Sequence, residues 1–225
     1  MDTVVCLAAH PDDVAACMGG TLLLLKDRCN LHVLCATKGE RGLPGRPMDE
    51  TAAIRQAEEQ SACDLLGAKL TFLGRIDAEA YADRQICGRV AALLDEIGPS
   101  VLFTLWPIDQ HPDHSAVSEV ARKALGAGQA KCPVVYFEAA LSCQTSQFVP
   151  DVYVDVTDVT DRKIELIRLH ACQNRDDQLV DFSMKQSTFR GWECGCRYAE
   201  GFKLTRPLKV APEFFLKWTG EKLSV

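Results

Sequence analysis

Two short motifs, each of which follows an apolar run, constrain this chain more than any other feature. The first reads His-Pro-Asp-Asp at residues 10–13 and directly follows the run 4–9. The second reads His-Pro-Asp-His at residues 111–114 and comes shortly after the run 101–106. Apolar runs of this length are typical of buried strands. Because ligands of open α/β sheets bind at the carboxyl ends of the strands, we expect both motifs at that edge of one sheet.

The rest of the chain alternates between strand-like and helix-like patterns. Further short apolar runs, typical of strands, lie at residues 31–36, 70–73 and 134–137. Between the runs, apolar residues recur at helical spacing, and we expect helices near residues 22–30, 48–66, 86–97, 113–125 and 163–171. This alternation predicts an α/β chain with a Rossmann-like three-layer fold and a mainly parallel sheet. No repeat or linker divides the sequence, so we expect one domain over residues 1–225.

Three segments are less regular. Residues 37–47 contain three glycines and two prolines, which indicates a polar loop, and long loops inside compact domains are often functional. Valines alternate with other residues over 152–156, as in a half-exposed strand. Residues 173–192 are weakly patterned, and we expect irregular excursions and a lid there.

Composition excludes several classes of protein. The net charge of −6 argues against a nucleic-acid partner, which usually requires a basic face. No apolar run approaches the ~20 residues that span a bilayer, and the first residues lack the pattern of a signal peptide, so we expect no membrane association. Most of the eleven cysteines lie in apolar segments and are interpreted as reduced core residues of a cytoplasmic protein. The oligomeric state stays open, a homo-oligomer included.

The two motifs together offer the donors of a catalytic metal site. Such a zinc site has three protein ligands and keeps one position open. His10, Asp13 and His114 can supply two imidazoles and one carboxylate to a single divalent cation, for which Zn²⁺ is the first choice. With these ligands the site keeps a net positive charge, which activates water for hydrolysis.

The remaining polar residues of the motifs would lie beside that cation. Asp12 can accept a proton from water as a general base. His111 can stabilise a developing oxyanion or protonate a leaving amine. Asp113 can orient an imidazole through a hydrogen bond. A His-Pro-Asp turn alone is an ordinary helix start, so the interpretation rests on finding two of them, each after a strand.

The sequence resembles the LmbE-like (PIG-L) zinc-dependent N-deacetylases. The resemblance rests chiefly on Ala-His-Pro-Asp-Asp at residues 9–13, on Gly19-Gly20 and on His-Pro-Asp-His at 111–114. Weaker matches to the family extend the resemblance over most of residues 4–204, and they lie at 37–42, at Arg55 and Glu58, at 170–173 and at 198–202.

The resemblance implies the same roles for the residues of both motifs. His10, Asp13 and His114 would hold one Zn²⁺ per chain, with other divalent metals as alternatives. Asp12 would be the general base, and His111, tuned by Asp113, the oxyanion stabiliser or acid. Glu40 and Arg55 would lie near the mouth that binds the substrate.

The chain departs from the family pattern at two positions. Val14 stands where the family commonly has Glu, and Cys172 replaces the usual Ser. Neither change removes a ligand or a catalytic group. Support around the metal would be weaker at the first position, and a hydroxyl hydrogen bond is lost at the second.

The implied activity is the removal of an acetyl group from a small N-acetylated, sugar-like molecule, with release of acetate and an amine. An N-acetylglucosaminyl compound is the first choice. One alternative is a metal-dependent amidase that acts on a larger amide conjugate. Another is a non-catalytic metal-binding module with a Rossmann-like fold. The sequence contains neither a dinucleotide-binding Gly-x-Gly-x-x-Gly fingerprint nor a Gly-x-Ser-x-Gly elbow.

Overall fold

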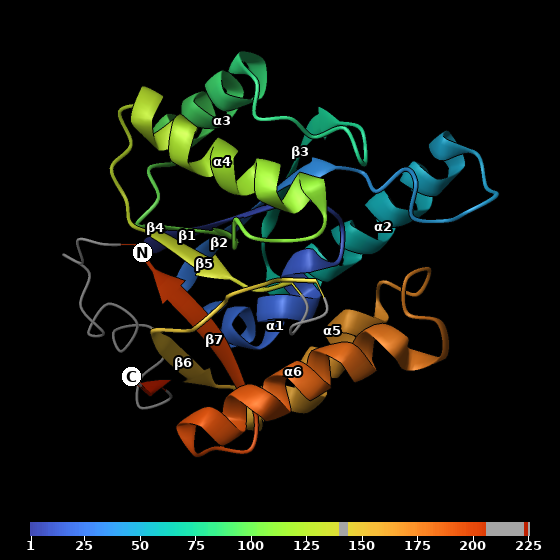
Figure 1. Ribbon diagram of the computed structural model, residues 1–225, viewed down its shortest axis with the longest axis vertical. Helices are drawn as coiled ribbons and strands as arrows, with labels where there is room; N and C mark the ends of the chain where they lie inside the picture. The colour runs from blue at the N-terminus through green and yellow to red at the C-terminus, as the bar shows by residue number, and fades with distance from the viewer. Residues whose placement is uncertain (140–143, 206–222, 225) are drawn as a thin grey trace.

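The computed structural model describes residues 1–139, 144–205 and 223–224, and its centre is one sheet of eight strands (Figure 1). The strands are β1 (Asp2–Ala8), β2 (Cys29–Thr37), β3 (Lys69–Arg75), β4 (Val101–Leu105), β5 (Val134–Phe137), β6 (Val152–Asp155), β7 (Ala199–Leu204) and β8 (Leu223–Ser224). Their order across the sheet is β3-β2-β1-β4-β5-β7-β6-β8. The first five strands are parallel, and β7, β6 and β8 pair antiparallel. The predicted α/β fold with a mainly parallel sheet is confirmed.

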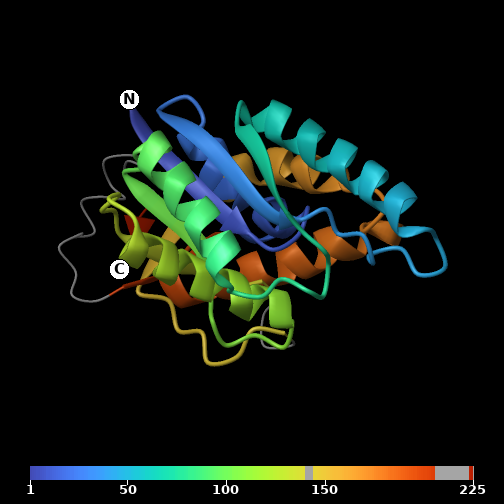
Figure 2. The same ribbon diagram turned by 90° about the horizontal axis from the view of Figure 1, so that it is seen from above.

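The helices form a layer on each face of the sheet. They are α1 (Asp13–Leu25), α2 (Met48–Leu66), α3 (Arg84–Ile97), α4 (Pro112–Ala127), α5 (Thr160–Arg168) and α6 (Gln178–Cys194), with short 3₁₀ turns at Thr157–Val159 and Arg175–Asp177. Helices α3 and α4 pack together on one face, and α1, α2, α5 and α6 cover the other (Figures 1 and 2). Among the described residues, no helix combines the length and apolar character needed to cross a bilayer.

The order of the strands brings the two motifs together. From β1 the chain builds outward through β2 and β3, and it then returns to the other side of β1 as β4. Strands β1 and β4 therefore flank the switch point of the sheet, where α/β proteins bind ligands. Their registers are level, since Val4 pairs with Val101 and Leu7 with Thr104. Both strands are buried on both faces, which explains their continuous apolar runs.

Helix α1 begins earlier than the sequence indicates. We expected a helix near residues 22–30, but it starts at Asp13 and changes direction at Met18, whose φ of −141° is not helical. After this kink the amides of Gly20 and Thr21 donate to the Glu200 carboxylate, at 2.9 and 2.7 Å. A Cβ at Gly20 would lie 2.7 Å from Val156, so close packing requires glycine there. Strand β7 thus caps the second half of α1 through Glu200.

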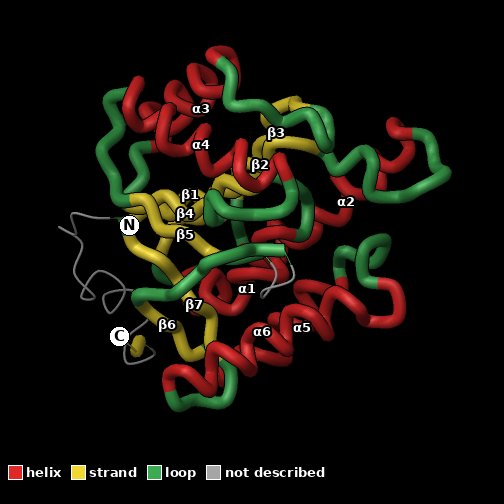
Figure 3. Tube along the Cα trace, viewed as in Figure 1, coloured by secondary structure: helices red, strands yellow, loops and turns green. Residues whose placement is uncertain are grey.

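The prediction for residues 173–192 is wrong. Most of this segment belongs to α6, a regular helix that packs along α5 (Figure 3). Its buried side is polar: Ser183 donates to the Ala16 carbonyl at 2.6 Å, and Arg190 forms a two-pronged ion pair with Glu138. Its exposed side carries large apolar groups, namely Phe182, Phe189 and Trp192. Because this distribution inverts the usual helical pattern, periodicity could not reveal it. Residues 38–47 form a loop, as expected.

Candidate active site

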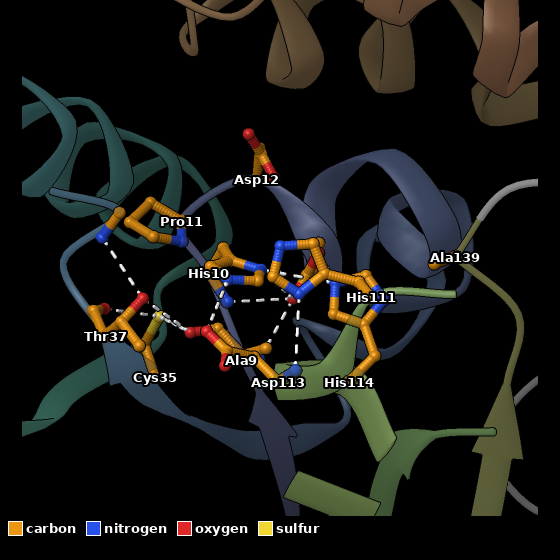
Figure 4. A network of polar contacts seen from close by, with 12 residues as sticks. Ala9, His10, Pro11, Asp12, Cys35, Thr37, His111, Asp113, His114 and Ala139 are labelled. Atoms are coloured by element: carbon orange, nitrogen blue, oxygen red, sulfur yellow. Dashed lines mark hydrogen bonds and ion pairs between the residues drawn. The ribbon is translucent and has the colours of Figure 1, made fainter. Parts of the chain in front are cut away.

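The two motifs meet at the carboxyl ends of β1 and β4. His10 lies between β1 and α1, whereas His111 and His114 lie at the start of α4. Figure 4 shows the three imidazoles gathered in one place, with Asp12 beside them. The His10 ring meets the edge of His111 at a centroid distance of 4.5 Å, and His111 stacks on His114 at 4.9 Å. Residues separated by about a hundred positions therefore form one cluster, as the sequence predicts.

Three groups in this cluster have the spacing of metal ligands. His10 Nδ1 lies 3.2 Å from His114 Nε2, and Asp13 faces each ring with a different oxygen: Oδ2 lies 3.8 Å from His10 Nδ1, and Oδ1 lies 3.4 Å from His114 Nε2. Ligands about 2.0–2.2 Å from a tetrahedral zinc are about 3.3–3.6 Å apart. All three side chains are buried. The three groups lie close together around one point, and their role as the ligands of one cation stays a prediction.

A second trio of donors is less suitable. Nitrogens of His10, His111 and His114 also lie within 4.8 Å of one another. However, Nδ1 of His111 accepts the backbone amide of Asp113 at 3.3 Å, and His111 is only partly buried. The Asp13 carboxylate adds negative charge next to both other ligands. It is therefore the better third ligand for a divalent cation.

Carboxylates hold the outward-facing nitrogens of both imidazoles. His10 Nε2 lies 3.2 Å from Asp113 and 3.2 Å from Asp77, and His114 Nδ1 lies 3.3 Å from Asp109. Such contacts fix the orientation of metal-binding histidines. The imidazole that the Asp113 carboxylate contacts is His10. The oxygens of Asp113 also accept the backbone amides of residues 78 and 80, at 2.7 and 3.1 Å.

Sequence reasoning missed Asp77 and Asp109. Neither residue belongs to a motif, but each follows the carboxyl end of a parallel strand, β3 and β4 respectively. That position was the available signal, because all such ends meet at one edge of the sheet. Asp109 is itself held by the Thr145 hydroxyl at 2.8 Å and by the amide of His111 at 2.8 Å.

The electrostatics of the cluster favour a cation. Burial by itself lowers the pKa of His10, but hydrogen bonds to Asp113 and Asp77 raise it to about 9. Burial likewise opposes protonation of His114, yet the charge of Asp13 and the contact with Asp109 raise its pKa to about 10. Although burial disfavours the charged carboxylate, the two imidazoles hold the pKa of Asp13 well below its usual range. Carboxylates that stabilise protonated imidazoles so strongly would also stabilise a divalent cation.

Asp12 is held in an uncommon backbone conformation beside the ligands. Its φ is 101°, in a region that non-glycine residues rarely adopt, at a cost of about 1–3 kcal/mol. Its amide donates to Glu59 at 3.1 Å, and its carboxylate accepts from Arg55 at 2.7 Å. Burial raises the pKa of Asp12 to about 6, although Arg55 opposes the shift. These contacts keep the carboxylate next to the three candidate ligands.

The two residues predicted at the substrate mouth have different surroundings. Arg55 is buried and donates to the carbonyls of Pro11 and Gly39 as well as to Asp12, and it also lines a cavity next to the ligands. Glu40 accepts the amide of Asp77 at 3.1 Å, so it supports the loop that carries this carboxylate. Substrate contact by either residue stays a prediction.

A second layer of buried groups lies behind Asp12. Glu59 is buried, and burial raises its pKa to about 8. His170 lies 3.7 Å from Glu59, and burial lowers the pKa of His170 to about 3. His170 is therefore a buried, neutral histidine that packs behind the site. Sequence reasoning assigned no role to Glu59, since a carboxylate on a helix is usually exposed to solvent.

Known proteins similar to this chain share its family and its fold. The model of the PIG-L family, described as GlcNAc-PI de-N-acetylase, matches residues 5–125. A probable N-acetyl-alpha-D-glucosaminyl L-malate deacetylase 2 of Bacillus anthracis is 29% identical over 182 residues, which cover 76% of this chain and 80% of the relative. A 4-oxalmesaconate hydratase of Pseudomonas putida is 24% identical over 204 residues, or 82% of this chain and 78% of the relative.

A solved structure extends the likeness to three dimensions. The N,N'-diacetylchitobiose deacetylase of Pyrococcus horikoshii superposes with a TM-score of 0.82 at 27% sequence identity, covering 91% of this chain and 84% of that one. The family match includes β1, β4 and both motifs, so it covers the cluster described above. The chain therefore belongs to the PIG-L family.

Proposed function

We propose that this protein is a zinc-dependent deacetylase that cleaves the acetamide of a small amino sugar, releasing acetate and a free amine. The observation that carries the proposal is the triangle formed by His10, His114 and Asp13, with the Asp12 carboxylate next to it. A cation at this triangle, flanked by a carboxylate that is not a ligand, suits hydrolysis of an amide.

Asp12 would move the protons. When bound, a divalent cation supplies positive charge that lowers the pKa of water and polarises a carbonyl oxygen. Asp12 accepts the proton of the attacking water and can return it to the leaving nitrogen. Arg55 holds the carboxylate in position through its 2.7 Å contact. The fixed backbone of Asp12 keeps the base in place without reorganisation during the reaction.

His111 would stabilise the oxyanion that develops on the former carbonyl. Its Nδ1 accepts the Asp113 amide at 3.3 Å, so the neutral ring carries its proton on Nε2. Burial lowers the pKa of His111, and so do the imidazoles of His10 and His114 when they are protonated, which favours this neutral form. The Nε2–H group is then free to act as a donor, and the His111 ring lies next to both imidazoles of the triangle.

Two observations support an amino sugar as the substrate. The relatives named above include enzymes whose names specify deacetylation of glucosaminyl and chitobiose compounds. In addition, a cavity of about 400 Å³ beside the triangle is lined by Arg41, Arg55, Asp77 and Gln173, and we call it the polar cavity. Such groups can bind the hydroxyls of a sugar, which must not be buried without partners.

The proposal is tested by reconstitution. Chelator-treated protein is loaded with Zn²⁺, its metal content is measured, and acetate and amine release are followed with a panel of N-acetylated sugars. We expect one Zn²⁺ per chain and activity that depends on it. Stoichiometric release of both products from N-acetylglucosaminyl compounds would support the assignment. Zinc binding without hydrolysis of any amide would contradict it.

The same assay separates the alternatives. An amidase for larger conjugates would release amine from bulky amides but not from N-acetyl sugars. A hydratase adds water to its substrate without releasing an amine, so amine analysis distinguishes it from both amide hydrolases. A non-catalytic metal-binding module would bind zinc and substrate without turnover.

A further inference from the structure

Two cavities share the wall that carries the catalytic groups. Asp12, Asp13, His114 and Gln144 line both of them. The polar cavity extends from this wall toward Arg41. The other has a volume of about 460 Å³ and extends between α1 and α6, and we call it the α6 cavity. A substrate whose amide lies at the shared wall can therefore place one substituent in each cavity.

The α6 cavity differs from the polar cavity in the chemistry of its walls. Most of its described lining beyond the shared wall is apolar or small, and these residues are Ala16, Cys17, Ala139, Leu179 and Phe182. Phe182 is 57% exposed, so it presents a large apolar surface at the edge of the cavity. An apolar surface of this size next to catalytic groups is a common feature of ligand pockets.

The polar groups of these walls already have partners. Ser183 donates its hydroxyl to the Ala16 carbonyl at 2.6 Å, and Gln186 donates its amide to the Glu138 carbonyl. The Cys17 thiol is uncharged, because burial raises its pKa well above its usual value. These walls offer a sugar fewer charged and polar groups than the polar cavity, whose Arg41, Arg55, Asp77 and Gln173 also contact other protein groups, so a sugar is less favourable here.

Lys185 does not change this conclusion. It is the one lysine or arginine among the described lining residues, and it pairs with Asp181 one helical turn earlier at 2.5 Å. Both side chains are largely exposed. The charge therefore lies at the solvent side of the cavity, where it can remain hydrated.

We propose that the α6 cavity binds the acyl group of the substrate, and that this enzyme hydrolyses amino sugars with N-acyl chains longer than acetyl. This inference rests on the function proposed above, and it adds the class of acyl group. A methyl group is about as large as a water molecule, whose share of liquid volume is about 30 Å³. An acetyl group would thus fill a small part of 460 Å³, whereas a chain of several carbons would bury its surface there.

The first test is a series of substrates. N-acetyl-, N-butyryl- and N-hexanoylglucosamine are compared with the zinc-loaded enzyme by amine release. We expect kcat/KM to rise by roughly fourfold for each buried methylene, until the chain reaches the end of the cavity. A decrease of kcat/KM from acetyl to hexanoyl would overturn the proposal.

The second test alters the cavity. Leu179→Trp should fill part of the space and abolish the increase of kcat/KM with chain length, so that the ratio of kcat/KM for the hexanoyl and acetyl compounds falls to about one or below. Phe182→Ala should reduce the increase of kcat/KM with acyl chain length several-fold. It should not disturb the fold, because the Phe182 side chain is exposed. Phe189→Ala is the matched control, since this exposed aromatic lies on α6 outside the cavity. An equal response of all three variants would contradict the assignment.

A binding measurement separates this inference from the proposed activity. Calorimetry of the three compounds with zinc-loaded Asp12→Asn should give a Kd that decreases with chain length. If no amide is hydrolysed by the wild type but this trend remains, the function fails and the acyl pocket stands. If the Kd does not vary with the acyl chain but decreases for the hexyl glycoside of N-acetylglucosamine, the cavity binds the other end of the substrate and the inference is wrong.

Discussion

The two His-Pro-Asp motifs have similar sequences, but their backbones are held in different ways. The second is an ordinary helix start: Pro112 occupies the first turn of α4, and the His111 side chain caps the amide of Asp113. The first contains Asp12 at a φ of 101°, and contacts from the distant helix α2 hold it there. The comparison teaches that a local pattern can specify the second motif, whereas the first depends on tertiary packing.

The side chains of the motifs are nevertheless interlocked. Asp113 of the second motif orients His10 of the first, and Asp13 of the first faces His114 of the second. Each motif thus contains a carboxylate that contacts a candidate metal-binding histidine of the other motif. Substitutions should therefore separate groups that act on the substrate from groups that support the metal.

The largest effect should come from the base in the first motif. Asp12→Asn keeps the size of the side chain but removes its ability to accept a proton. We expect kcat to decrease by about 10²–10⁴-fold, while the zinc content stays at that of the wild type. Steady-state kinetics with elemental analysis tests this. Activity within tenfold of the wild type would show that another group is the base.

The second motif should show a smaller effect at His111. We expect His111→Ala to reduce kcat by about 10²–10³-fold, because one donor to the oxyanion is lost, with little change in zinc content. The helix cap is lost as well, so the thermal midpoint is measured in parallel. If kcat is unchanged while the midpoint falls, His111 is only a cap.

Much of this site could be predicted because its signals are local. Strands β1 and β4 are continuous apolar runs, and helix α2 has the predicted bounds Met48–Leu66. Chain order and strand topology then bring His10 close to His114. The candidate ligands could therefore be predicted from the two apolar runs, the expected strand topology and the residue types that zinc prefers.

The remaining parts depend on interactions that local patterns do not encode. Helix α6 has a polar inner side because Ser183 and Arg190 meet buried carbonyl and carboxylate groups of other elements. Glu200 caps the second half of α1 from β7, and Lys163 balances its charge at 2.8 Å. Each contact joins residues far apart in sequence, so periodicity cannot show it.

The carboxylates behind the ligands should have an intermediate effect that differs between the motifs. His10 contacts both Asp113 and Asp77, whereas the outward nitrogen of His114 contacts Asp109. We therefore expect Asp109→Asn to weaken zinc binding by about 10–100-fold and Asp77→Asn to weaken it less. Competition with a chromophoric chelator measures both. The opposite order would mean that the two carboxylates on His10 do not substitute for each other.

The smallest effect concerns the support of the first motif by Glu59. Its pKa is about 8 in the folded protein, above the ordinary value of 4.5, chiefly because the carboxyl group is buried. Between these values the folded state keeps a proton that the unfolded state has lost, so stability decreases as the pH rises. From pH 5.5 to 7.0 this group should reduce the free energy of unfolding by about 2 kcal/mol.

Glu59→Gln removes this titration but keeps an oxygen that can accept the amide of Asp12. The unfolding free energies of the metal-free variant and wild type are measured by urea denaturation at pH 5.5 and at pH 7.0. Between these two pH values, the variant should gain about 2 kcal/mol of stability relative to the wild type. Glu50→Gln, at an exposed position of α2, is the matched control and should show no such shift. If the Glu59 and Glu50 variants respond alike, Glu59 is ionised in the folded protein. Its charge would then lie directly behind Asp12, and the first motif would be supported by a carboxylate ion instead of a neutral acid.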